Sequence, residues 1–319
     1  MPARQPVAER ETLGALQPLT AAWLRAQVLK LAAPSPALPL AVAVSGGADS
    51  LALLKLSAEA FAGEVQALTV DHGLRAESAR EAAQVAAIAR SLGVPHAILP
   101  PDAPIGQANV QAEAREARYL RLARHCREQG LAALLTAHHA DDQAETLVMR
   151  LNRGSGLAGL AGIRARQFLH GCLVLRPLLS QRRCAVRALL CGTGWEVVAD
   201  PSNEDGRFDR ARARRLLAGT SGLDAARAAA SAAHLADAHE ALLWATERAW
   251  ASRVSGRFHL DLEDLPPELC RQLLARAFHE LGLEPRGGAI ARLLARGGGT
   301  LAGVRVRVRA NVWIVSPPG

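Results

Sequence analysis

Residues Pro39 to Ser50 read PLAVAVSGGADS and contain the strongest indication of the fold in this chain. Its apolar first half predicts a buried strand, and the leucine-rich run Leu51 to Leu56 that follows it predicts a helix. Two adjacent glycines between them allow a tight turn whose N–H groups face an anion at the positive end of the helix. The stretch therefore predicts a phosphate-binding loop, to which Ser45 and Ser50 add hydroxyl donors.

This loop differs from the common mononucleotide-binding pattern GxxxxGK[ST]. No Lys-Ser or Lys-Thr pair follows Gly46, and Lys55 lies too deep in the expected helix to reach a phosphate. The alternative is an ordinary glycine turn capped by Ser45. The position of the loop directly after a buried strand favours the phosphate-binding interpretation.

The chain has 319 residues, enough for one large domain and a smaller one. Its hydrophobic fraction of 50% comes mainly from Ala and Leu in interrupted runs, so we expect no membrane-spanning segment and no membrane partner. The N-terminus lacks an apolar signal core, which predicts a cytoplasmic protein. Five cysteines without a CxxC pair argue against a disulfide framework, a zinc ribbon or a sulfur-relay site.

The formal net charge is +8, and all but two of the 38 basic residues are arginines. Arginine binds phosphate through two parallel hydrogen bonds and stacks on bases, which fits a nucleic-acid partner. A genome-wide preference for Ala and Arg explains the charge equally well. Charge alone therefore does not decide the partner.

Strand-like runs alternate with helical patterns through the first half of the chain. The expected strands cover 39–44, 65–70, 94–99, 131–137 and 172–175, and the expected helices cover 50–61, 76–92, 109–129 and 141–152. This alternation predicts an α/β fold, a doubly wound parallel sheet with helices on both faces. Ligands of such sheets bind beyond the carboxyl ends of the strands, where the strand order reverses.

After Pro177 the pattern changes to arginine-rich helices, followed by a long Ala/Leu helix over 223–254. We expect the domain boundary where GTSG interrupts the helices, between residues 217 and 223. The predicted domains are thus a catalytic domain over 1–220 and a smaller, mainly helical domain over 221–319.

The tail of the chain, residues 304–315, reads VRVRVRANVWIV. This alternation predicts a half-exposed strand pair with Arg305, Arg307 and Arg309 on one face. A solvated face is the favoured interpretation, and a phosphate-contacting face is the alternative.

Two polar residues, Asp71 and His72, follow the second expected strand within VDHGLR. The end of a strand beside the phosphate loop is where an adenosine would lie, so both could line a nucleotide pocket. Asp-His-Gly also makes routine turns, and this segment alone is weak evidence for a site.

Residues 136–146 read TAHHADDQAET, in which a strand ends at His138 and a helix begins near Asp141. Asp142 and Glu145 are three residues apart, so their carboxylates share one helix face. Such a pair could hold Mg²⁺ beside a triphosphate, or bind a cationic amine. Acids also stabilise the first turn of a helix, but this cluster exceeds what capping requires. A zinc site is disfavoured because a third soft ligand is missing from the pattern.

Two further segments leave alternatives open. The glycine-rich stretch 150–162 (RLNRGSGLAGLAG) fits a mobile loop that closes on a nucleotide, or a helix C-cap followed by a linker. Arg115 and Arg118 are three residues apart and can face one anion together. From spacing alone, an ion-pair ladder with Glu113 and Glu116 is favoured.

In their order and spacing, the segments SGGADS, VDHGLR, NVQAEAREARY, AHHADDQAET, RGSGLAGL, RPLL and DPSNEDGRFDR resemble the tRNA(Ile)-lysidine synthetase family of PP-loop ATP pyrophosphatases. The resemblance is strong over residues 40–217. RGSG after DDQAET, together with DxSN and the arginine that follows, is typical of this family among PP-loop enzymes. A thiolating relative would carry CxxC pairs, and an amide-forming relative a glutaminase domain.

The resemblance implies a PP-loop, adenine nucleotide alpha hydrolase-like fold and a ligase that uses ATP with Mg²⁺. ATP would adenylylate the oxygen at carbon 2 of the wobble cytidine of an isoleucine tRNA. The ε-amine of L-lysine would then displace AMP, which changes codon and amino-acid specificity from methionine to isoleucine. Another PP-loop tRNA-modifying enzyme and an ATP-binding factor without turnover are the alternatives. The oligomeric state stays open, with a homodimer among the options.

The resemblance also implies roles for single residues. The residues that would bind the ATP phosphates are Ser45, Gly46, Gly47, Ala48, Asp49 and Ser50. Of these, Asp49 would orient the phosphates or the metal. His138, Asp142 and Glu145 would hold the lysine substrate and its reactive amine.

Arginines and a loop complete the implied site. Arg118 and Arg210 would meet phosphate or adenylate, and Asp200 to Asn203 would shape a tRNA-facing loop. Ala211 stands where family members typically have Asn, which puts one polar contact in doubt.

Overall fold

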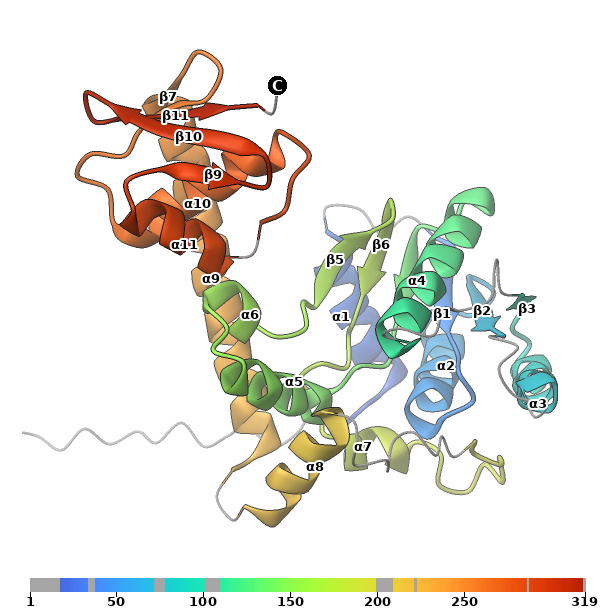
Figure 1. Ribbon diagram of the computed structural model, residues 1–319. Helices are drawn as coiled ribbons and strands as arrows, with labels where there is room; N and C mark the ends of the chain where they lie inside the picture. The colour runs from blue at the N-terminus through green and yellow to red at the C-terminus, as the bar shows by residue number, and fades with distance from the viewer. Residues whose placement is uncertain are drawn as a thin grey trace, which may run out of the picture. The chain divides into compact units, whose positions relative to one another are not determined.

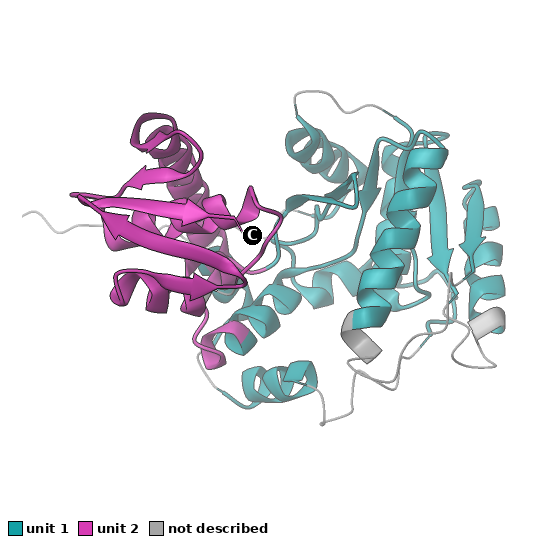
Figure 2. Cartoon of the chain, turned by 45° about the horizontal axis from the view of Figure 1, so that its top comes forward, with its two compact units in different colours: residues 1–149, 163–231 teal, residues 150–162, 232–319 magenta. Residues whose placement is uncertain are grey.

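The structure is a computed structural model that describes residues 18–33, 38–71, 78–100, 110–198, 209–220, 223–285 and 287–317. Its contacts divide the chain into two compact units, one of residues 1–149 with 163–231 and one of residues 150–162 with 232–319 (Figure 2). Each unit has a hydrophobic core of its own. The domain boundary near residue 220 stays a prediction, because a division by contacts does not define where a domain ends.

The first unit is built on a six-stranded sheet in the order β3-β2-β1-β4-β6-β5 (Figure 1). The strands are β1 (Leu40–Ala43), β2 (Val65–Val70), β3 (His96–Leu99), β4 (Ala133–Leu135), β5 (Arg166–Leu169) and β6 (Cys172–Leu175). All neighbours pair in parallel except β5, which is antiparallel to β6 at the edge. The parallel strands confirm the predicted ones. The sequence did not reveal β5, because its side chains are mostly exposed and form no apolar pattern.

Helices cover both faces of this sheet, as predicted. The helices packed on its strands are α1 (Ala21–Ala32), α2 (Ala48–Ala60), α3 (Ser78–Ser91) and α4 (Val110–Glu128). The unit also contains α5 (Ala140–Asn152), α7 (Arg183–Ala188) and α8 (Asp209–Gly219). Successive residues of β1 point to opposite faces. Leu40 and Val42 pack in the core that α1 and α2 share, whereas Ala41 packs in the core formed with α4.

The strand order reverses beside β1. From β1 the chain builds β2 and β3 outward on one side, and it then returns to form β4 on the other side of β1. A crevice for ligands forms at such a point, beyond the carboxyl ends of the two strands. The SGGADS loop follows β1, and the HHADDQAE segment follows β4. The topology therefore brings the two predicted motifs to the same edge of the sheet.

The second unit contains a five-stranded antiparallel sheet in the order β7-β8-β11-β10-β9. Its elements are α6 (Leu157–Leu160), most of α9 (Ala225–Arg253), β7 (Val254–Ser255), β8 (His259–Asp261), α10 (Pro267–His279), α11 (Gly287–Ala295), β9 (Gly299–Leu301), β10 (Val304–Arg309) and β11 (Val312–Ser316). The predicted strand pair corresponds to β10 and β11. The other three strands have two or three residues each, too few to show a period in the sequence.

One face of this sheet is covered and the other is exposed. Val304 and Val306 pack with side chains of α10 and α11, such as Phe278. Because side chains alternate along a strand, Arg305 and Arg307 lie on the opposite face, where they are exposed.

Within the described residues, no helix is both long and apolar enough to cross a lipid bilayer.

Candidate active site

The loop between β1 and α2 requires glycine at Gly46. This residue has φ +82°, a left-handed conformation that side chains disfavour. A Cβ here would lie 2.9 Å from Cγ2 of Val198, whose backbone N–H donates to the Gly46 carbonyl at 3.1 Å. Both the conformation and the close packing therefore exclude larger residues.

Two serine hydroxyls stabilise the loop from within. The Ser50 hydroxyl accepts from the Ser45 N–H at 3.1 Å and donates to the Gly47 carbonyl at 2.8 Å. Gly47 is the N-cap of α2, and no side chain caps the helix there. Ser45 is thus not the helix cap of the alternative interpretation, and the positive end of α2 keeps its capacity to bind an anion.

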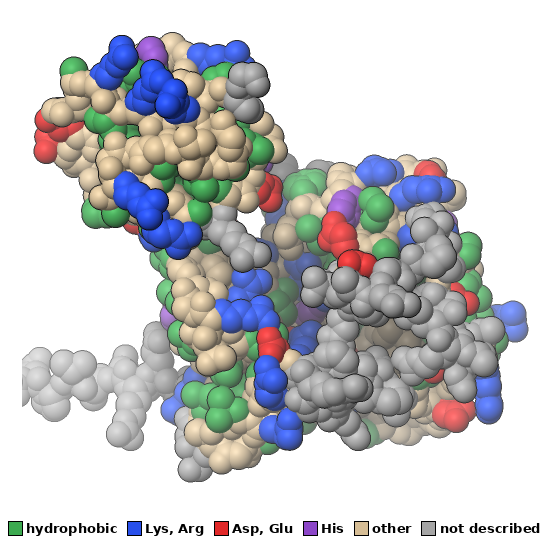
Figure 3. Space-filling view, viewed as in Figure 1, with side chains coloured by type: hydrophobic (Ala, Val, Ile, Leu, Met, Phe, Trp, Pro, Cys, Tyr) green, Lys and Arg blue, Asp and Glu red, His purple; other side chains and the backbone are tan. Residues whose placement is uncertain are grey.

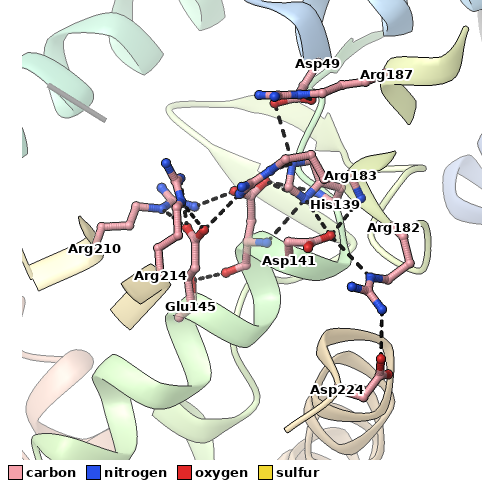
Figure 4. Close-up of polar contacts among 12 residues, drawn as sticks. Asp49, His139, Asp141, Glu145, Arg182, Arg183, Arg187, Arg210, Arg214 and Asp224 are labelled. Carbon is pink, nitrogen blue, oxygen red and sulfur yellow. Dashed lines mark hydrogen bonds and ion pairs between the residues drawn. The ribbon is translucent and has the colours of Figure 1, made fainter. Parts of the chain in front are cut away.

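Asp49 lies in the first turn of α2 and faces two basic side chains. Its Oδ1 accepts from Nε of Arg187 at 3.2 Å, and its Oδ2 lies 3.5 Å from Nε2 of His139 (Figure 4). Burial works to raise the pKa of Asp49, but hydrogen bonding with His139 and the charge of Arg187 keep the pKa below its ordinary value. Asp49 is therefore ionised at neutral pH.

His139 joins the phosphate loop to the acidic helix α5. Its side chain is 1% exposed. The His139 N–H donates to Oδ2 of Asp142 at 3.0 Å, and the Asp142 N–H donates to Nδ1 of His139 at 3.3 Å. Nε of Arg183 donates to Nε2 of His139 at 3.3 Å, and the same nitrogen lies 3.5 Å from Oδ2 of Asp49. No sequence pattern singled out His139. The reciprocal pairing of residues three apart at the start of a helix is the signal that could have revealed it.

Glu145 is buried and is surrounded by arginines. Its Oε1 accepts from Nη2 of Arg183 and from Nε of Arg214, both at 2.8 Å, and its Oε2 accepts from Nε of Arg210 at 2.8 Å (Figure 4). Burial would raise the pKa of Glu145, but the hydrogen bonds from Arg214 and Arg210 lower the pKa to about 2. Glu145 thus carries a negative charge that three guanidinium groups compensate.

Asp142 shares the helix face of Glu145, as their spacing predicted. Nη2 of Arg210 donates to Oδ1 of Asp142 at 2.9 Å, so one guanidinium bridges both carboxylates. Asp141 points elsewhere and accepts from the Arg183 N–H at 2.7 Å, where it caps α7. The predicted pair therefore exists as a unit and is bound to α8 through Arg210.

His138 lies among arginines at the carboxyl end of β4. Its Nδ1 is 3.0 Å from the Thr136 hydroxyl, and its Nε2 is 3.5 Å from Nη2 of Arg115. Burial, followed by the charges of Arg115, Arg176 and Arg210, lowers the pKa of His138 well below its ordinary value. The imidazole is therefore neutral at neutral pH.

Arg115 and Arg118 do not form the ion-pair ladder that their spacing favoured. Their guanidinium carbons lie 5.0 Å and 5.8 Å from the ring centroid of Tyr119. Glu116 instead pairs with His170 at 3.0 Å. Among the described residues, no ion pair links Arg115 or Arg118 to Glu113 or Glu116. Burial and the charge of Arg115 lower the pKa of Arg118. Both arginines instead lie against the Tyr119 ring, and the shared anion site stays a prediction.

The structure adds α7, whose arginines the sequence analysis did not select. Arg183 reaches Glu145, and Arg187 reaches Asp49, so this short helix contacts the acids of both motifs. Arg182 lies 2.8 Å from Asp224, at the start of α9. The RPLLSQRR segment follows β6, another strand with its carboxyl end at this edge, and that position was the available signal.

The remaining predicted residues follow β2, belong to α8 or lie outside the described part of the chain. His72 and the segment Asp200 to Asn203 are outside the described part of the chain. Asp71 directly follows β2, and its N–H donates to the Leu99 carbonyl at 3.0 Å. Ala211 is 6% exposed within α8.

The glycine-rich stretch that follows α5 ends the helix. Gly154 has φ +64°, and the Ser155 N–H donates to the Arg150 carbonyl at 3.0 Å. This pattern is that of a helix C-cap, one of the two interpretations left open. Residues 150–162 belong to the second compact unit.

Comparison with known proteins agrees with this arrangement. The PP-loop domain family matches residues 21–220. A tRNA(Ile)-lysidine synthase of Novosphingobium aromaticivorans is 49% identical over 283 residues, which cover 85% of this chain and 86% of the relative. The chain belongs to the tRNA(Ile)-lysidine synthase family. A second member, from Zymomonas mobilis, is 41% identical and covers 80% of each chain.

The solved structures agree on the fold. The U34-tRNA thiolase NcsA from Methanococcus maripaludis superimposes with a TM-score of 0.55 at 18% identity, over 69% of this chain and 77% of its own. At that identity the likeness concerns the fold alone. The PP-loop fold of the family thus holds the loop after β1 and the acidic helix after β4 at one sheet edge.

Proposed function

We propose that this protein ligates L-lysine to carbon 2 of the wobble cytidine of isoleucine tRNA and thereby forms lysidine. In the first step the cytidine oxygen attacks the α-phosphorus of ATP, and pyrophosphate leaves. In the second step the ε-amine of lysine attacks carbon 2 and loses a proton, while the carbon–oxygen bond breaks and AMP leaves with that oxygen. Adenylylation makes the oxygen a good leaving group, so the protein's task is positioning and charge stabilisation.

One observation supports this function above the others, namely the contact of both motifs with a single buried imidazole. His139 lies 3.5 Å from Asp49 of the phosphate loop and exchanges hydrogen bonds with Asp142 of the acidic helix. An anion-binding loop and a carboxylate site thus adjoin each other. This arrangement suits a reaction that joins a nucleotide and an amine at one carbon atom.

The nucleotide site in this proposal is the loop Ser45 to Ser50 with Arg187. Magnesium bound together with a nucleotide needs only one or two protein carboxylates, and it supplies positive charge to the phosphates. Asp49 offers one carboxylate whose side chain is 29% exposed. In the described ranges, no cluster of three or more acidic, His or Cys side chains could hold a metal. The residues therefore fit a metal that the nucleotide itself helps to bind.

The lysine site in this proposal is formed by His138, Asp142 and Glu145. The Glu145 carboxylate is ionised and suits an ammonium group, while the neutral imidazole of His138 can accept its proton. Arg118 and Arg210 adjoin His138 and would meet the phosphate of the adenylate. Each role depends on the family assignment as well as on position.

The tRNA partner is supported by the distribution of basic residues. Lys and Arg side chains form separate groups on the surface of each unit (Figure 3). On the second unit, the exposed arginines of β10 form a row on the uncovered face of the sheet. Such a row suits phosphate contacts, which position a nucleic acid without reading its sequence.

The products of ATP test this proposal. With isoleucine tRNA and lysine both present, the protein should release AMP and pyrophosphate in equal amounts. An ATP-binding factor would release neither, and an ordinary ATPase would release ADP. Asp49→Asn should lower AMP formation by a transition-state cost of about 2–4 kcal/mol, with the fold intact. Glu59→Gln is the control, because Glu59 lies on the same helix and pairs with Lys55.

A further inference from the structure

Glu145 has no bonding capacity left for a substrate amine. A carboxylate offers about four lone-pair positions. Glu145 receives four N–H contacts, because Arg214 also reaches Oε2 with Nη2 at 3.4 Å in addition to the three bonds of 2.8 Å. Its side chain is 2% exposed. An ammonium group can therefore reach this carboxylate only if an arginine leaves it.

The three arginines outnumber the two carboxylates, Glu145 and Asp142, that their side chains contact. Arg183, Arg210 and Arg214 converge on Glu145, and of the three only Arg210 also contacts Asp142. Their side chains are between 22% and 40% exposed, whereas the Glu145 side chain is 2% exposed. A phosphate arriving from the nucleotide side would thus meet guanidinium groups first. Arginine binds phosphate as well as carboxylate through paired N–H donors, so a polyanion competes directly with Glu145.

We propose that Arg183 and Arg214 are phosphate-binding residues of the ligation reaction and that they uncover Glu145 for lysine when they move to the phosphate. The inference rests on the proposed function, in which Glu145 binds lysine. Without nucleotide the arginines occupy the carboxylate. When nucleotide is present, its phosphate binds the arginines, and the Glu145 carboxylate binds the lysine amine.

This exchange makes the binding of the two substrates cooperative. The phosphate binds the arginines that leave Glu145, and the lysine amine binds the carboxylate that they uncover. Such coupling is reciprocal and typically changes each affinity about 5–150-fold. Lysine would then bind well only after ATP or the adenylate is in place. The order of binding matches the order of the two chemical steps.

Arg214 offers the cleanest test, because it occupies one position on each oxygen of Glu145. The dissociation constant of L-lysine is measured by calorimetry with and without α,β-methylene-ATP, which cannot release pyrophosphate. In the wild type the analogue should lower this constant at least about tenfold. In Arg214→Gln, lysine should bind without the analogue more tightly than in the wild type, and the analogue should change the constant much less.

Two further variants and one probe complete the experiment. Arg183→Gln should act in the same direction as Arg214→Gln, which keeps the test informative if one variant fails to fold. Arg212→Gln is the matched control, because this exposed arginine of α8 pairs with Asp209. Inorganic triphosphate in place of the analogue should reproduce part of the effect, since the exchange depends on phosphate.

Several outcomes would overturn the inference. One is a lysine affinity that the analogue leaves unchanged in the wild type. Another is weaker lysine binding, without nucleotide, in both Arg214→Gln and Arg183→Gln. That result would mean that the arginines stay bound to Glu145 and have a structural role. If the wild type ligates lysine to tRNA but shows no coupling, only this inference fails. If it ligates no lysine at all, the proposed function fails as well.

Discussion

Arg214 contacts both carboxylate oxygens of Glu145, with Nε 2.8 Å from Oε1 and Nη2 3.4 Å from Oε2. The contact joins α8 to α5, two helices that lie far apart in the sequence. It requires an ionised carboxylate. Hydrogen bonds from Arg214 and Arg210 outweigh the effect of burial and lower the pKa of Glu145 from 4.5 to about 2.

The pKa of Glu145 predicts a stability change in acid. A carboxylate with a lowered folded-state pKa stabilises the protein above its unfolded-state pKa and loses that effect as the pH falls through its folded-state pKa. The free energy of unfolding should therefore lose up to about 3 kcal/mol from this group between pH 4.5 and about 2. Urea unfolding of wild type and Glu145→Gln over this range measures it. The variant should show a shallower pH dependence, and equal slopes would contradict the prediction.

Glu145→Gln should also separate the two half-reactions. The change keeps the shape of the side chain and removes its charge, so the adenylated tRNA should still form while lysine binds more weakly. A lost charge-assisted hydrogen bond of about 1.5–3 kcal/mol raises the lysine requirement about 10- to 100-fold. Single-turnover assays should show the adenylated intermediate accumulating. If adenylylation disappears and lysine dependence is unchanged, Glu145 serves the nucleotide or a metal instead.

Gly46 and Gly63 allow conformational strain to be separated from steric collision. Both have positive φ, at +82° and +78°, so alanine at either site costs about 1–2 kcal/mol of backbone strain. Only at Gly46 would the new methyl group meet another side chain, that of Val198 at 2.9 Å. Gly46→Ala should therefore abolish nucleotide binding and lower the melting temperature more than Gly63→Ala does. Equal effects of the two variants would show that the packing against Val198 is unimportant.

The exposed arginines of β10 should contribute to tRNA affinity. Changing Arg305, Arg307 and Arg309 together to Ala should weaken binding and reduce the slope of log affinity against log salt concentration, because fewer counterions are released. Arg292→Ala is the control, since Arg292 is an exposed residue of α11, on the helical side of the same unit. Filter binding at several salt concentrations gives both quantities. An unchanged slope would support the solvated face that the sequence favoured.

The sequence predicted what contiguous motifs and periodicity encode. The SGGADS loop and the Asp142–Glu145 pair are each written within one short segment, and strand and helix periods placed them at the carboxyl ends of β1 and β4. The parallel order of the strands then follows from general rules for α/β sheets. This was enough to predict the fold and to place both motifs at one edge of the sheet.

The partners of those residues could not be read from the sequence. Arg183, Arg187 and Arg214 meet their acids only because α7 and α8 fold back on the sheet edge, and a chain with this many arginines gives no sign of which ones are paired. The identity of His139 as the link was hidden for a similar reason. The family resemblance pointed to His138, whereas the burial of His139 and its contact with Asp49 depend on the tertiary structure.

The position of lysine on the tRNA distinguishes lysidine formation from any other modification. The protein is incubated with ATP, isotopically labelled L-lysine and isoleucine tRNA, and the tRNA is then digested to nucleosides and analysed by mass spectrometry. The account predicts that the label appears in one nucleoside, the wobble cytidine, with lysine in place of the oxygen at carbon 2. A tRNA with uridine at that position should remain unlabelled. Label at another position, or none with a folded protein and intact tRNA, would contradict the account.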